Sequence, residues 1–121
     1  MRVAGEATTA LIDSGATHCF VSSALVNRLG IDPTRAVKPL MVTLANGVEL
    51  VASRVAKLAI TFPGPESLCH ECVFYVVPEL HQPLILGYAW LSEHNPKIDW
   101  VAGLITLPAT ASSFVATRPQ R

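Results

Sequence analysis

The stretch that decides the fold spans residues 10–20 and reads Ala-Leu-Ile-Asp-Ser-Gly-Ala-Thr-His-Cys-Phe. Its apolar start predicts a short buried strand, because a brief apolar run that ends at turn residues is typical of a strand in a core. Asp13 therefore stands where a strand leaves the core, and a carboxylate there loses hydration unless a partner compensates for it. Asp13 either caps a tight turn or is kept for its chemistry.

Asp-Ser-Gly is also ordinary turn sequence, since Asp bonds to nearby backbone and Gly adopts conformations that other residues resist. The tripeptide alone favours a plain turn. The flanking sequence favours a catalytic role for Asp13 over a plain turn. The tripeptide lies between two apolar runs, and a second apolar element that ends in glycine, Ile85-Leu86-Gly87, follows far downstream.

This combination resembles the retropepsin family, the aspartic proteases of retroviruses and of gypsy-class retrotransposons. The resemblance covers residues 3–106. The matching segments are residues 11–17 for the catalytic loop, 20–22 for the segment after it, 42–47 for the first strand and tip of the flap, and 84–87 for the second family signature. Trp90-Leu91, His94-Asn95-Pro96 and Ile98-Asp99-Trp100 are similar to the retrotransposon branch, which often carries Asp where this chain has Ala89.

The resemblance implies a role for each matching residue. Asp13, Ser14 and Gly15 would be catalytic, and Ile85, Leu86 and Gly87 would pack beneath the catalytic loop. The residues implied in substrate binding are Ala16, Thr17, Ala45, Asn46 and Gly47. Pepsin-like proteases carry two such loops, whereas this chain has one, so an aspartic protease of this kind needs a second copy of itself.

Composition places the chain among ordinary folded domains. Its 121 residues suit one domain, and 50% hydrophobic with 15% charged residues supply a core. The formal net charge of zero lacks the basic excess of nucleic-acid binding, so we expect no direct nucleic-acid partner. The apolar runs are too short to cross a bilayer, and no secretory signal is evident, so we expect no membrane association. Three cysteines, an odd number, suit a reducing compartment, which predicts a cytoplasmic protein or one inside retrotransposon particles.

Many short strands, turn signals and two short helices predict a mostly β fold, a closed barrel of the retropepsin type with a flap hairpin. Residues 31–39 are expected to form a loop, and residues 24–29 and 88–94 helices. The expected strands are residues 2–4 and 7–12 as a hairpin turned at Gly5-Glu6, 40–44 and 48–52 as the flap hairpin, 55–62, 72–77, 84–86, and 98–100 with 104–107 as a terminal hairpin. Asn46-Gly47 predicts a type I′ turn in the flap. The domain would span residues 1–107, with residues 108–121 a flexible tail or linker.

Other chemistry has weaker support in the sequence. Cys69-His70-Glu71-Cys72 has the two-cysteine spacing of a zinc knuckle, but no second pair is available and Cys19 should face the core. His81 and His94 are interpreted as surface residues. We therefore expect neither a metal nor another cofactor.

The sequence thus predicts an aspartic endopeptidase, active as a homodimer, that cuts extended, mostly apolar peptides of a retrotransposon polyprotein. In such a dimer the two Asp13 carboxylates share one proton, and one of them activates a water molecule. One alternative is a domesticated, catalytically silent domain that binds peptides or dimerises. Another is a small β-barrel binding module with a chance Asp-Ser-Gly turn.

Overall fold

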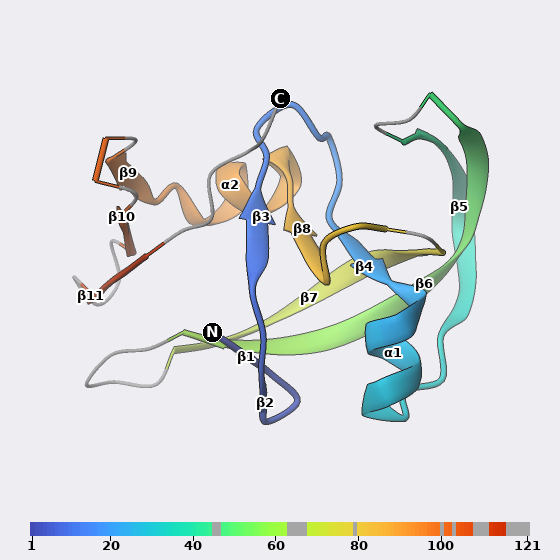
Figure 1. Ribbon diagram of the computed structural model, residues 1–121, viewed down its shortest axis with the longest axis horizontal. Helices are drawn as coiled ribbons and strands as arrows, with labels where there is room; N and C mark the ends of the chain where they lie inside the picture. The colour runs from blue at the N-terminus through green and yellow to red at the C-terminus, as the bar shows by residue number, and fades with distance from the viewer. Residues whose placement is uncertain are drawn as a thin grey trace.

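A computed structural model gives the architecture of the chain (Figure 1). The structure describes residues 1–44, 47–62, 68–78, 80–99, 101–102, 104–107 and 112–115. Within these ranges the chain is built mainly of strands, with two short helices, which confirms the expected mostly β fold.

The main sheet curls into a half-barrel and contains eight strands in the order β2-β1-β6-β7-β4-β8-β3, with β5 paired to β6 beside this path. Its strands are β1 (Arg2–Val3), β2 (Glu6–Ala7), β3 (Ala10–Ile12), β4 (Phe20–Ser22), β5 (Thr34–Thr43), β6 (Glu49–Phe62), β7 (Leu68–Val77) and β8 (Leu84–Leu86). A smaller antiparallel sheet lies to one side of it (Figure 1) and contains β9 (Lys97–Asp99), β10 (Leu104–Leu107) and β11 (Ser112–Val115).

The hydrophobic core lies inside the curl of the main sheet. Its largest fully buried side chains are Trp90, Phe74, Leu25, Leu58, Ile60, Leu84 and Leu86. A second, smaller cluster contains Phe20, Val42, Ala52 and Val77, with half-buried Leu44 and Ile85 packed against it. This second cluster joins the flap hairpin to β4, β7 and β8.

Both helices form where the sequence predicts them. The first, α1 (Ser23–Leu29), begins at Ser22, whose hydroxyl accepts the Leu25 N–H at 3.1 Å, and ends at Gly30 in the left-handed conformation. The second, α2 (Tyr88–His94), begins after Gly87 and ends at Asn95. Helix α1 packs against β4 and β7, and α2 packs against β8. Among the described residues, no helix is long and apolar enough to cross a membrane.

The N-terminal hairpin differs from the prediction. It turns at Ala4 and Gly5, because Val3 pairs with Glu6, and both turn residues have positive φ as a two-residue hairpin loop requires. The predicted second strand is also split, since β2 ends at Ala7 and β3 begins at Ala10. β3 then pairs in parallel with β8, and this pairing carries the chain to Asp13.

The predicted loop over residues 31–39 is wrong from Thr34 onward, where β5 begins. The register between β5 and β6 shifts between Arg35 and Leu40, so the strand contains an irregular stretch rather than a loop. Pro39 lies in that stretch. A proline favours extended backbone at the residue before it, and its missing N–H is tolerated where the ladder is interrupted.

Strand β6 is a single strand, whereas the sequence suggested separate strands over residues 48–52 and 55–62. Strand β7 begins at Leu68, earlier than the predicted residue 72. The terminal hairpin is confirmed, because β9 pairs antiparallel with β10, although Trp100 lies outside the described residues. In the range expected to be a tail, the structure describes only β11, which pairs with β10. The predicted boundary at residue 107 stays a prediction.

Candidate active site

The loop at the end of β3 holds Asp13 by backbone contacts on both sides. The Asp13 N–H donates to the Leu86 carbonyl at 3.1 Å, which extends the β3–β8 pairing by one residue. The Ala16 N–H donates to the Asp13 carbonyl at 3.1 Å, and the Gly15 N–H donates to Asp13 Oδ1 at 2.9 Å. The loop therefore fixes both the backbone and the carboxylate of Asp13.

One carboxylate oxygen of Asp13 is left open. Among the described residues, Oδ2 has no hydrogen-bond partner and Asp13 forms no ion pair. Asp32 is exposed, and Asp99 Oδ1 accepts the N–H groups of Val101 and Ala102, so both other aspartates lie away from this loop's contacts. Asp13 is thus half-buried and oriented, with an oxygen available for chemistry.

Helix α2 supports the loop from behind. The Tyr88 N–H donates to the Ala16 carbonyl at 2.7 Å, and the Ala89 N–H donates to the Thr17 carbonyl at 3.2 Å. Gly87 is buried against this loop, and a Cβ atom there would lie 2.7 Å from the Ala16 carbonyl oxygen and overlap that of His18. The loop and the start of α2 are packed at a distance that excludes a side chain at position 87.

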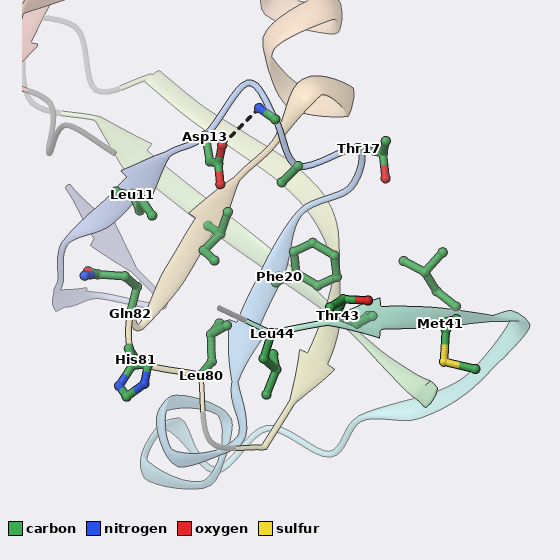
Figure 2. Close-up of a pocket in the computed structure, with 15 residues that line it drawn as sticks. Leu11, Asp13, Thr17, Phe20, Met41, Thr43, Leu44, Leu80, His81 and Gln82 are labelled. Carbon is green, nitrogen blue, oxygen red and sulfur yellow. Dashed lines mark hydrogen bonds between the residues drawn. The ribbon is translucent and has the colours of Figure 1, made fainter. Parts of the chain in front are cut away.

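A cavity of about 650 Å³ opens beside Asp13. Figure 2 shows Asp13 at one end of it, with Leu44, Leu80 and Phe20 further along. The lining comes from β3, from the catalytic-type loop after it (residues 13–19), from β4, from the end of β5, from the segment before β8 and from β8 itself. Its members are Leu11, Asp13, Gly15, Ala16, Thr17, Phe20, Leu40, Met41, Val42, Thr43, Leu44, Leu80, His81, Gln82 and Ile85. Asp13 is the only carboxylate among these residues. The cavity is largely apolar, as ligand sites usually are.

The hairpin of β5 and β6 lines one side of this cavity through residues 40–44. Its tip is closed by the Leu44 N–H to the Val48 carbonyl at 2.8 Å and by the Gly47 N–H to the Leu44 carbonyl at 2.9 Å. Gly47 has φ 83°. The predicted type I′ turn includes Asn46, which lies outside the described residues, so the turn type stays a prediction. Ala45 and Asn46 lie outside the described residues.

Five of the eleven predicted site residues lie around the cavity. Asp13, Gly15, Ala16, Thr17 and Ile85 line the cavity. Ser14 is exposed beside it, Leu86 and Gly87 lie behind the loop, and Gly47 lies at the hairpin tip.

Sequence reasoning missed one wall of the cavity, formed by Leu80, His81 and Gln82. The only signal in the sequence was their place in a proline-flanked loop that leads into β8. It also missed Leu11 and Phe20, which flank the catalytic-type loop on either side.

The cysteines do not gather into a ligand set. On β7, Cys69 is exposed and Cys72 is turned toward the core, so the two thiols lie on opposite faces of the strand. Burial, with smaller contributions from Cys19 and nearby glutamates, raises the pKa of the Cys72 thiol to about 11. Within the described residues, no group of three or more His, Cys, Asp or Glu side chains is arranged to hold a metal ion. Cys19 is buried, as predicted.

The fold and the loop define a retropepsin-like domain. The crystal structure of the retroviral protease-like domain of Ddi1 from Leishmania major superposes with a TM-score of 0.66 at 22% sequence identity, over 88% of this chain and 83% of that one. The family model of the PEG10/RTL1 protease domain matches residues 9–113, and the chain belongs to this family of retropepsin-like domains from genes derived from gypsy retrotransposons. A comparison with curated protein sequences found no match.

Proposed function

We propose that this domain is an aspartic endopeptidase that works as a homodimer, with Asp13 of each chain forming the catalytic pair. The observation that carries the proposal is the state of Asp13: Oδ1 is fixed by the Gly15 N–H, while Oδ2 is open beside a largely apolar cavity. A single chain supplies one carboxylate to this cavity. Acid–base hydrolysis of this type needs two, so the second comes from a partner chain.

The proposed reaction needs no covalent intermediate. Two carboxylates held together cannot both ionise readily, so the pair keeps one proton. The ionised member takes a proton from water, which attacks the scissile carbonyl carbon, while the protonated member donates its proton to the carbonyl oxygen. Collapse of the tetrahedral intermediate breaks the C–N bond: one of its hydroxyl groups gives a proton to the ionised carboxylate, the leaving nitrogen takes the proton of the other carboxyl group, and the pair is left with one proton again. Ser14 and Gly15 would hold the two loops together and let the carboxylates approach.

The proposed substrate is an extended polypeptide with apolar side chains near the cut. The side chains of Phe20, Leu44 and Leu80 would receive them along the cavity. Thr17 and the hairpin tip, with Ala45, Asn46 and Gly47, would bind the substrate backbone, because an extended peptide can pair with strand edges. The biological substrate would be a polyprotein of the same gene. Exposed Cys69 as a free thiol supports a reducing, intracellular setting.

The test is cleavage of a peptide library by the wild-type chain and by Asp13→Asn, between about pH 4 and pH 7. The wild type should cleave, with specific activity that rises with protein concentration as the dimer forms, and Asp13→Asn should not. Asp32→Asn is the matched control, since Asp32 is an exposed carboxylate outside the cavity. Activity that survives in Asp13→Asn would contradict the proposal.

A second candidate function is peptide binding without hydrolysis. It is supported by the largely apolar lining of the cavity, which offers contacts to apolar peptide side chains whether or not Asp13 performs chemistry. Fluorescence anisotropy with labelled apolar peptides separates the two functions. A dimer that binds such peptides and never cleaves them would replace the enzyme with the binding module.

A further inference from the structure

Two histidine rings stack between β7 and α2. The ring centroids of His70 and His94 are 4.0 Å apart and the rings are within 10° of parallel. The ring of Phe62, on β6, lies against His70 with a centroid distance of 5.6 Å. The ring of Trp90 lies against both Phe62 and His94, with centroid distances of 5.6 Å and 5.1 Å. His94 is therefore a packed residue, and its interpretation as a surface residue is wrong.

The surroundings of His70 in this stack favour its uncharged form over its protonated form. Its Nδ1 is buried, and within the part of the chain that the structure describes it has no hydrogen-bond partner. A proton added there would place a charge in a poorly hydrated site without an acceptor. It would also face a second imidazole across the stack, and two cations at that distance repel each other.

Other charged and titratable groups around the stack do little to offset this cost. Glu93, on α2, favours the charged form of His70, but burial and His94 outweigh it, so the pKa of His70 lies below the ordinary histidine value of 6.5. Glu71, the next residue on β7, is exposed and forms an ion pair with Lys57 at 2.8 Å. The thiol of Cys72, on the same face as His70, has a pKa of about 11 and stays neutral.

Helix α2 connects this stack to the catalytic-type loop. Its first turn binds the loop through the N–H groups of Tyr88 and Ala89, and its last turn carries His94. Trp90, between these two ends, is almost completely buried. Because α2 has only seven residues, loss of the packing at its last turn weakens the support of the whole helix.

We propose that His70 and His94 are positioning residues, whose stack keeps α2 against the Asp13 loop only while His70 is uncharged, so that this pair sets the acid limit of the domain. The consequence for catalysis rests on the proposed protease function. The consequence for stability does not.

The direction of the pH effect follows from linkage. Below the ordinary histidine pKa of 6.5 the unfolded chain binds a proton that folded His70, with its lowered pKa, does not bind. Stability therefore falls as the pH decreases through this window, and it stops falling once folded His70 is protonated as well. Above pH 6.5 this contribution is fully present.

The first experiment measures thermal unfolding between about pH 7.5 and pH 5 for the wild type, His70→Phe and His94→Phe. Phenylalanine keeps an aromatic ring at either position. His70→Phe removes the titration of His70, and His94→Phe removes the second imidazole that, after burial, lowers the pKa of His70. The Tm of the wild type should fall by several degrees over this range, and each variant should lose a clear part of that fall. His81→Phe, at an exposed histidine outside the stack, should keep the wild-type fall in Tm.

Both His70→Phe and His94→Phe are made in case one of them fails to fold. A single variant that is folded at pH 7.5 is enough for the comparison. Equal falls in Tm for the wild type and a folded stack variant would overturn the proposal. In a wild type that cleaves peptides, the acid limb of the pH–rate profile should move to lower pH in the folded variant, and an unmoved limb would overturn the link to catalysis. Absence of cleavage at every pH would count against the protease function alone, because the Tm comparison stands without it.

Discussion

Gly87 lies directly against His18: a Cβ atom on Gly87 would overlap the carbonyl oxygen of His18. The same atom would lie 2.7 Å from the Ala16 carbonyl oxygen. These neighbours are backbone atoms, which cannot rotate away as the end of a side chain can. The contact therefore fixes how closely α2 approaches the loop that carries Asp13.

Gly87→Ala should consequently lower the stability of the domain and displace the loop. Forcing a methyl group into a packed site costs about 3 kcal/mol when backbone must move. The free energy of unfolding, measured by urea denaturation, should therefore decrease by about 3 kcal/mol. Peptide cleavage should also be lost, because the loop that carries Asp13 is displaced.

Gly30→Ala is the matched control for this change. Gly30 has φ 68°, and a Cβ atom there would meet nothing within 4 Å. The substitution should cost about 1 kcal/mol through the left-handed backbone alone, and it should leave cleavage intact. If Gly87→Ala were no more harmful than Gly30→Ala, close packing at Gly87 would not matter.

Gly15→Ala should separate activity from stability. A Cβ atom on Gly15 would lie 3.2 Å from Asp13 Oδ1, the oxygen that the Gly15 N–H binds. Gly15 is exposed, so the methyl group crowds the carboxylate rather than the core. We expect a change of less than about 1 kcal/mol in the free energy of unfolding, as is usual for surface substitutions, and a loss of most cleavage. Unchanged cleavage would show that the carboxylate tolerates the crowding.

The three thiols should react at very different rates. Cys69 is exposed, Cys19 is buried with a raised pKa, and burial raises the pKa of Cys72 to about 11. The thiolate is the reacting form, so at about pH 8 a thiol reagent should label one site per folded chain quickly.

Mass spectrometry after brief labelling identifies that site, and Cys69→Ser should remove the fast phase. The denatured chain should label at all three cysteines. Fast labelling of Cys72 in the native protein would contradict the burial described for its side chain.

Local signals in the sequence located both helices and the Asp13 loop. Ser22 and Gly30 bound α1, and Gly87 and Asn95 bound α2, because capping and left-handed positions have strong residue preferences. The resemblance of residues 84–87 to a known signature implied that they pack beneath the Asp13 loop, but not that β8 pairs in parallel with β3. No local pattern reports a parallel pairing between strands so distant in the chain.

Other features depended on tertiary contacts. Strand β6 continues through Ser53 and Arg54, both exposed, so the alternation that marks a strand is interrupted there. Proline signals predicted a loop where pairing with β6 draws the chain into β5. The stack of His70 on His94 joins two elements whose sequences contain no sign of each other.

Strand β6 anchors the hairpin beside the cavity at one end only, in the core of the domain. The strand pairs through Leu50 with Val42 beside the cavity and through Ile60 with Val3 in the core, without a break between them. Only the neighbouring β5 has an irregular stretch at which to bend. The stiffness of the hairpin is therefore set at its buried root. Under the proposed function, a softer core around Ile60 would change how fast a peptide enters and leaves the distant cavity.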